Sequence, residues 1–108
     1  VMIHEVLQPD LVSILTESLD ENGQPKLAKI IRDTKDYHAT PVEAAEAANQ
    51  ANADLLVFYH YAPMPQNGIM DRIYMRGVAN VRPEGVLAAL EGTRLTLPAQ
   101  SDTIKIAD

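Results

Sequence analysis

The feature that most constrains the fold is a run of consecutive apolar residues at positions 55–59. The run does not alternate between apolar and polar residues, so it predicts a strand of a parallel sheet that is covered on both faces. It is far too short to cross a bilayer, which takes about 20 residues. Because the helices expected in this chain can cover only one face, the other face is expected to need a layer from outside the chain.

Helical patterns lie between this strand and an earlier apolar segment at residues 1–4. A strand, helices and a second strand predict an α/β fold with a right-handed crossover between parallel strands. Proline or a capping residue marks each helix start. The helices are expected to begin at Pro9 or Asp10, at Pro25, and at Pro41, where Thr40 and Glu43 have the spacing of a capping box.

The rest of the chain predicts loops and short strands. Residues 20–23 and 62–72 are expected to be loops because they carry glycine, proline or polar residues. Residues 73–78 are expected to form a short strand. Residues 86–90 and 93–97 flank Glu91 and Gly92, which predicts a terminal hairpin.

Composition narrows the function classes. With 108 residues the chain has room for one small domain. A net charge of −6 argues against general nucleic-acid binding, which draws on clustered lysine and arginine. The absence of cysteine excludes disulfides and thiolate zinc ligands. It does not determine the cellular compartment of the protein, although the cytoplasm is slightly favoured.

Three histidines are expected to meet at one edge of the sheet. His4 is expected to end the first strand and His60 the second, and His38 precedes the helix that begins near Thr40. The start of a crossover helix lies at the carboxyl edge of the strands, where ligands bind in open α/β sheets. These imidazoles and Glu5 are therefore candidates for catalysis or metal binding.

Each candidate also has a purely structural interpretation. A single histidine at a strand end is more often a hydrogen-bonded structural residue than a ligand, and Glu5 could be a general base or a solvated carboxylate. Three imidazoles could also converge on one metal. Three methionines and two arginines could contact a substrate. Methionines more often fill gaps in the core, however, and arginines more often lie at the surface as solvated charges. The three methionines are Met64, Met70 and Met75, and the arginines are Arg72 and Arg76.

Three segments, in this order, resemble the last third of metallo-β-lactamase-fold hydrolases, in particular the ribonuclease-Z-like and arylsulfatase-like branch. They are residues 1–6, which include His4-Glu5, residues 37–45, which include His38-Ala39-Thr40, and residues 55–60, which end in His60. The resemblance covers residues 1–60, and more loosely the segment up to Pro98. It implies the C-terminal half of an αββα sandwich.

The resemblance also implies a dinuclear zinc site with His60 as its last ligand. His38 would donate a proton or stabilise developing charge, and Glu5 would belong to the same cluster. His4 would contact this cluster without binding the metal itself. A metal-bound hydroxide would attack a phosphate, sulfate or carboxylic ester.

The chain departs from the family in one respect. The family's other ligands come from a His-x-His-x-Asp-His motif, a middle histidine and a bridging aspartate, and none of these patterns occurs in the sequence. One imidazole cannot hold zinc, since a catalytic site takes about three protein ligands. We therefore expect a partial domain that is inactive alone and is completed by an N-terminal half or by a homodimer through the bare sheet face. The alternative is a stand-alone module that self-associates or binds a partner without catalysis.

Overall fold

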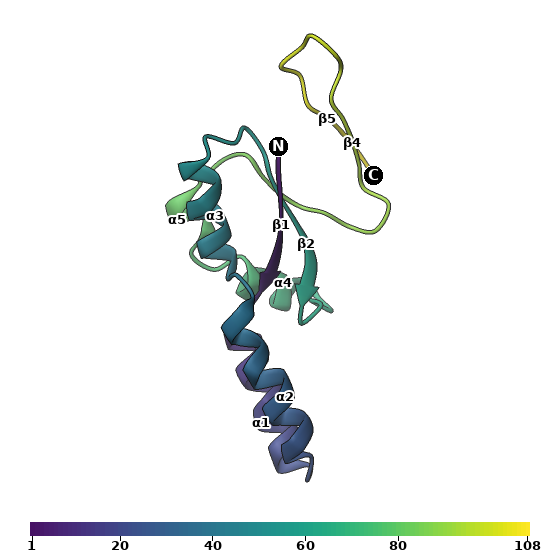
Figure 1. The fold of residues 1–108 in the computed structure, drawn as a ribbon. Coiled ribbons are helices and arrows are strands. Elements are labelled where there is room, and N and C mark those ends of the chain that lie inside the picture. The colour runs from purple at the N-terminus through teal and green to yellow at the C-terminus, as the bar shows by residue number, and fades with distance from the viewer.

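The computed structural model describes residues 1–108 and shows an α/β chain, as the sequence predicts (Figure 1). No helix is both long and apolar enough to cross a bilayer. In chain order the elements are β1 (Met2–Leu7), α1 (Pro9–Glu21), α2 (Pro25–Asp33), the 3₁₀ turn η1 (Thr34–Tyr37), α3 (Pro41–Gln50), β2 (Leu56–Ala62), α4 (Gly68–Tyr74), α5 (Val78–Val81), β3 (Val86–Ala88), β4 (Arg94–Thr96) and β5 (Lys105–Ala107).

The main sheet has three parallel strands in the order β1-β2-β3. The predicted apolar strand is its centre, and Leu56, Val57 and Phe58 are all nearly inaccessible to solvent. Leu56 pairs with Met2 on one side and with Val86 on the other. The parallel pairing of β1 with β2 follows from the long helical connection, because parallel strands cannot be joined by a tight turn.

Helix α3 covers one face of this sheet, and its sequence explains both its start and its close approach. The Thr40 side chain accepts a hydrogen bond from the Glu43 N–H at 3.1 Å, and the Glu43 carboxylate accepts one from the Thr40 N–H at 3.2 Å. The predicted capping box is therefore confirmed. Small side chains on the inner side of α3 let the helix lie close to the strands. The core beneath it consists of Val6, Leu11, Ala44, Ala45, Ala48, Leu56, Phe58, Tyr74 and Val78.

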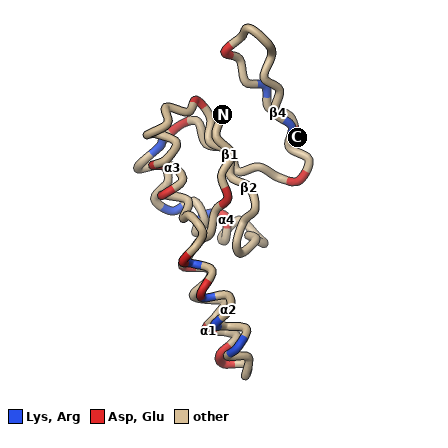
Figure 2. The backbone as a smooth tube through the Cα atoms, viewed as in Figure 1, with Lys and Arg blue, Asp and Glu red and all other residues tan.

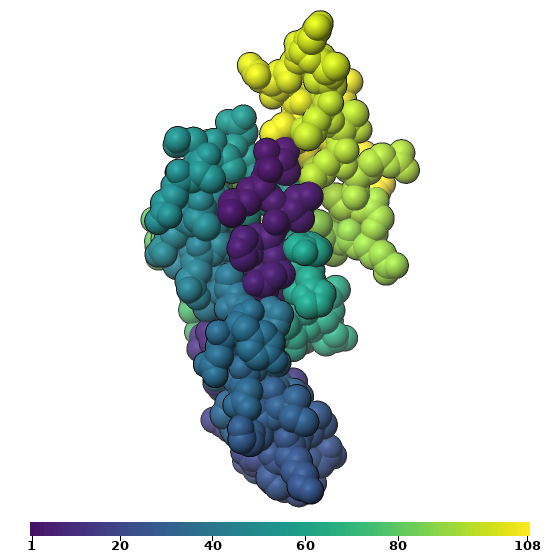
Figure 3. Space-filling model, in the orientation of Figure 1, coloured from purple at the N-terminus to yellow at the C-terminus, as the bar shows by residue number.

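The opposite face of the sheet is only partly covered, since Val57 is buried there but its neighbours on that face are not. Side chains alternate along a strand, so Val57 and Tyr59 point away from the face that carries Leu56 and Phe58. Ile3 pairs with Val57 in register and shares this face with Tyr59. Ile3 is 58% exposed and Tyr59 is 50% exposed. Figure 3 shows β1, in purple, uncovered by any helix on this side.

The segment after β2 differs from the prediction of a loop at 62–72 and a strand at 73–78. It forms α4 and α5 instead. The Asn67 side chain caps α4 by accepting a hydrogen bond from the Met70 N–H at 2.9 Å. Met70, Ile73 and Tyr74 then face the core at helical spacing. The apolar residues near position 73 gave a strand-like pattern, but their spacing over the longer window belongs to a helix.

The predicted terminal hairpin is also wrong. Residues 86–88 form β3, which pairs in parallel with β2, while β4 pairs in antiparallel fashion with β5, a strand that the sequence did not predict. The expected turn does exist, because the Thr93 N–H donates to the Leu90 carbonyl at 3.0 Å. The two flanking segments nevertheless diverge, since Val86 finds its partner in the buried strand β2.

Helices α1 and α2 contact each other and project from the body as an arm (Figure 1). Asp20 and Glu21, predicted to open a loop, are the last residues of α1. Acidic and basic residues alternate along the arm (Figure 2), and Arg32 pairs with Asp20 at 2.9 Å. With a longest dimension of 56 Å against 27 and 22 Å, the chain is elongated. Only 17 of 108 residues are buried, so its core is small.

Candidate functional site

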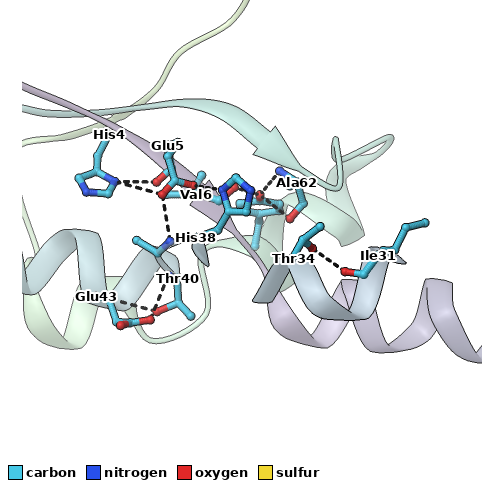
Figure 4. A network of polar contacts seen from close by, with 11 residues as sticks. His4, Glu5, Val6, Ile31, Thr34, His38, Thr40, Glu43 and Ala62 are labelled. Atoms are coloured by element: carbon cyan, nitrogen blue, oxygen red, sulfur yellow. Dashed lines mark hydrogen bonds and ion pairs between the residues drawn. The ribbon is translucent and has the colours of Figure 1, made fainter. Parts of the chain in front are cut away.

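His4, Glu5 and His38 lie close together (Figure 4), and the ring of His60, from β2, lies near that of His38. His4 and Glu5 belong to β1, and His38 lies between η1 and α3. The expectation that His4 and His60 end their strands is wrong, because β1 continues to Leu7 and β2 to Ala62. The strands run on because main-chain pairing between them continues beyond the histidines.

Glu5 is the centre of the polar contacts. One oxygen of its carboxylate accepts a hydrogen bond from the Ala39 N–H at 3.0 Å, and the other contacts Nδ1 of His38 at 2.8 Å. Nδ1 of His4 is 3.9 Å from the same carboxylate and makes its own hydrogen bond, of 2.7 Å, to the Glu5 carbonyl. The Glu5 side chain is 26% exposed. The structure thus brings Glu5, His4 and His38 into direct contact.

The contacts of Glu5 determine its ionisation. Burial is the largest single influence and would raise the pKa of its carboxyl group, but the Ala39 N–H and the His38 side chain act in the opposite direction. Their hydrogen bonds, together with the attraction of the His38 and His4 imidazoles, leave the pKa of Glu5 below its ordinary value. An ionised carboxylate can only accept hydrogen bonds, so Nδ1 of His38 is the donor. Nε2 of His38 is then free for another partner.

His60 occupies an irregular position in β2. Glu5 pairs with Tyr59 and Val6 pairs with Tyr61, so His60 is an extra residue without a partner in β1. Its φ angle of 49° lies in the left-handed region. Bulges of this kind re-aim a side chain and often lie beside active sites. Here the His60 ring lies 6.2 Å from the His38 ring, centre to centre, at an interplanar angle of 28°.

These residues do not form a metal site by themselves. No group of three or more histidine, cysteine, aspartate or glutamate side chains is arranged to hold an ion. A catalytic zinc ion takes about three protein ligands. His60 is exposed and offers one imidazole, while His38 and Glu5 are engaged with each other. Convergence of His4, His38 and His60 on one ion is therefore not the arrangement observed.

Two tyrosines support the site, and no sequence pattern indicates their role. The buried Tyr74 hydroxyl donates to the Val6 carbonyl at 2.8 Å and accepts from the Ala62 N–H at 2.9 Å, so it joins β1 to β2 just beyond His60. The Tyr61 hydroxyl lies 2.9 Å from the Ala89 carbonyl. Burial raises the pKa of Tyr61 to about 12, with Asp71 adding to the shift, and burial also raises that of Tyr74. Both hydroxyls therefore remain protonated and structural at neutral pH.

One hollow opens next to His60 and adjoins a second, larger one. The first has a volume of about 360 Å³ and is lined by His60 together with Tyr61, Met64 and Leu90. The other has a volume of about 510 Å³ and shares those last three residues with the first. Of the methionines considered as substrate contacts, Met64 and Met75 line the larger hollow and Met70 does not, although both Met70 and Met75 also pack against the core. The two candidate arginines line neither hollow, and Arg76 instead lies 3.5 Å from the Asp10 carboxylate.

Comparison with known proteins gives one similar sequence. A ribonuclease Z of Mycolicibacterium gilvum (strain PYR-GCK) is 33% identical to this chain over 70 residues, which make up 65% of the chain and 21% of that protein. The similarity thus covers about a fifth of the relative's length. No family model and no solved structure matches the chain.

Proposed function

We propose that this chain is the C-terminal segment of a metallo-β-lactamase-fold hydrolase that acts on ester bonds. The observation that carries the proposal is the contact of 2.8 Å between His38 and Glu5, with the His60 ring 6.2 Å from His38. The partial identity to a ribonuclease Z supports the same family. The segments that resemble the family are also those that bring these three residues together.

The His38–Glu5 pair is suited to proton transfer. Glu5 fixes the His38 tautomer by accepting from Nδ1, which leaves Nε2 to give or take a proton at a reacting oxygen. The negative charge of Glu5 stabilises the imidazolium form that arises during such a transfer. His4 contacts the same carboxylate at 3.9 Å and helps to hold it. In this proposal His38 is the catalytic residue, and Glu5 and His4 position it.

Zinc requires ligands that this chain does not supply. His60 contributes one imidazole, so a zinc ion beside it depends on side chains from another segment. We therefore assign no catalytic step to a metal on this chain and propose that it is inactive alone. This partly covered sheet face, on which Ile3 and Tyr59 are exposed, is the proposed contact for an N-terminal half that completes an αββα sandwich.

We propose a small ester rather than RNA as the substrate. The relative's name indicates a ribonuclease, but binding of RNA phosphates draws on clusters of lysine and arginine. This chain carries a net charge of −6, and its basic residues are interspersed with acidic ones (Figure 2). The hollow beside His60 and the larger one that adjoins it also have the size of a small-molecule site.

The test is to read the genomic DNA upstream of the Val1 codon and to express the complete reading frame. We expect an in-frame His-x-His-x-Asp-His sequence and a protein that hydrolyses p-nitrophenyl phosphate, sulfate or acetate esters. His38→Ala and His60→Ala should each lower kcat at least 100-fold, in line with the loss of a proton-transfer group or a metal ligand. Glu17→Gln, an exposed change on the arm, is the matched control. A complete reading frame without that motif and without esterase activity would refute the proposal.

The exposed row on the sheet favours a second candidate function, self-association without catalysis. Ile3 and Tyr59 are 58% and 50% exposed and share one face, and Val1, which is 45% exposed, directly precedes β1. Apolar groups gathered in this way are typical of a protein–protein contact. Sedimentation velocity over a concentration series should then show dimers that Tyr59→Lys dissociates. A monomer at all concentrations would eliminate this candidate.

A further inference from the structure

The larger hollow is a candidate binding site with a definite chemical character. Its volume of about 510 Å³ lies within the range of small-molecule pockets, roughly 300–1,000 Å³. Tyr61 and Tyr74 line it, but their hydroxyl groups bind main-chain atoms at 2.8–3.2 Å. They therefore offer the hollow aromatic surface rather than free hydrogen-bonding groups.

Two further polar side chains around this hollow, those of Gln66 and Asn67, also make local hydrogen bonds. The Gln66 amide donates to the Met64 carbonyl at 3.1 Å, and the Asn67 oxygen accepts from the Met70 N–H at 2.9 Å. Asp71 is the only ionisable lining residue apart from the tyrosines, and no lysine or arginine lines the hollow. A negative ligand group would lack a counter-charge there and would meet the Asp71 carboxylate. The aromatic and methionine side chains that make up much of the lining suit a neutral, apolar occupant.

The position of the hollow links it to the histidine cluster. It shares Tyr61, Met64 and Leu90 with the smaller hollow, which His60 lines. Met64 is 51% exposed and Leu90 is 65% exposed, so large apolar side chains at the shared rim remain open to solvent. An apolar group seated between them would remove this surface from water.

We propose that this hollow binds the neutral apolar part of the substrate, a phenyl- to naphthyl-sized ring or an alkyl chain of similar bulk. The ester group then extends through the shared rim toward His60. The catalytic meaning of the site rests on the proposed function, whereas the binding itself does not. The site thus selects esters by the apolar group they carry rather than by added charge.

Three of the four methionines provide a direct test on the chain as it stands. Met64 and Met75 line the hollow, whereas Met2 packs against the core at the start of β1. The chain is labelled with ¹³C-methyl methionine and titrated with 1-naphthol, a neutral aromatic probe. The Met64 and Met75 methyl signals should shift saturably and the Met2 signal should stay in place. Equal shifts of all signals, or no shift up to millimolar probe, would overturn the proposal.

Two matched variants and a charged probe sharpen the test. Leu90→Arg places a large cation at the rim and should weaken naphthol binding at least 10-fold. Leu97→Arg changes a residue of similar exposure, 60% against 65%, that does not line the hollow, and should leave binding unchanged. Tighter binding of 1-naphthyl sulfate than of 1-naphthol by the unmodified chain would refute the neutral character of the site. Because binding is measured without turnover, a protein that binds naphthol but hydrolyses no ester would refute only the proposed function.

Discussion

Replacement of His60 by glycine and by alanine tests whether its backbone conformation is imposed by the fold. The φ angle of 49° places His60 in a region where a Cβ atom crowds the following carbonyl oxygen. Glycine has no Cβ and adopts this conformation freely. We therefore expect His60→Gly to be more stable than His60→Ala, which reverses the order found at an ordinary strand position.

The expected size of this difference combines two opposing contributions. The left-handed conformation costs an L-residue with a Cβ about 1–2 kcal/mol. Glycine loses about 0.5–1 kcal/mol relative to alanine because its unfolded chain is more flexible. The net advantage of glycine at position 60 is about 0.5–1 kcal/mol. The adjacent Tyr59 has no positive φ angle and is 50% exposed, so there alanine should be more stable than glycine by about 0.5–1 kcal/mol.

Urea unfolding followed by circular dichroism measures all four variants under one set of conditions. The opposite signs at positions 59 and 60 should give a combined difference of about 1–2 kcal/mol, well above the error between variants. Thermal unfolding should show the same order, since about 1 kcal/mol shifts Tm by roughly 4–8 °C in a chain of this size. If alanine is as stable as glycine at position 60, the bulge relaxes without strain and the argument fails.

Two further predictions concern charge and close approach. Because the pKa of Glu5 is lowered by folding, its carboxylate stabilises the native state above the unfolded pKa, near 4.3, and this contribution is lost as pH falls through the folded value. Glu5→Gln should therefore reduce the free energy of unfolding by about 1 kcal/mol at pH 7, and by progressively less below pH 4. Glu17→Gln is the control. A difference between Glu5→Gln and the unmodified chain that stays constant down to pH 3 would contradict this. Gly85→Ala should destabilise the chain by about 2 kcal/mol more than Gly23→Ala in urea titrations. Both glycines have positive φ angles, but only at Gly85 would a Cβ lie 2.7 Å from a backbone oxygen. Equal effects would show that the backbone around Gly85 shifts to make room for the Cβ.

The sequence predicted the elements whose signals are local. The start of α3 follows from Pro41 at its first position and from Thr40 and Glu43, which form a capping box with each other. The parallel pairing of β1 with β2 follows from an apolar strand that is preceded by helices. The grouping of Glu5 and His38 follows in turn from that topology, and the structure places them 2.8 Å apart.

The elements that the sequence did not predict depend on distant partners. Val86 was assigned to a hairpin because of the glycine turn nearby, but burial against β2 outweighs the local pairing. The bulge at His60 arises from the registration of two strands, and no pattern within one strand indicates it. The bond from Tyr74 to the Val6 carbonyl likewise joins residues 68 positions apart, so helical spacing could indicate only that Tyr74 is buried.

We expect the arm formed by α1 and α2 to influence the order in which the chain folds. Its two helices are neighbours in sequence, and the Leu7 N–H donates to the Ala39 carbonyl at 2.8 Å across its base. Once the arm has formed, the two ends of the segment that contains α1 and α2 are held close together. The loop that must close for β2 to pair with β1 is then much shorter. We expect amides of α1 and α2 to gain protection before those of β2 in pulsed hydrogen exchange. Protection of β2 first would mean that the sheet nucleates folding and the arm docks onto it afterwards.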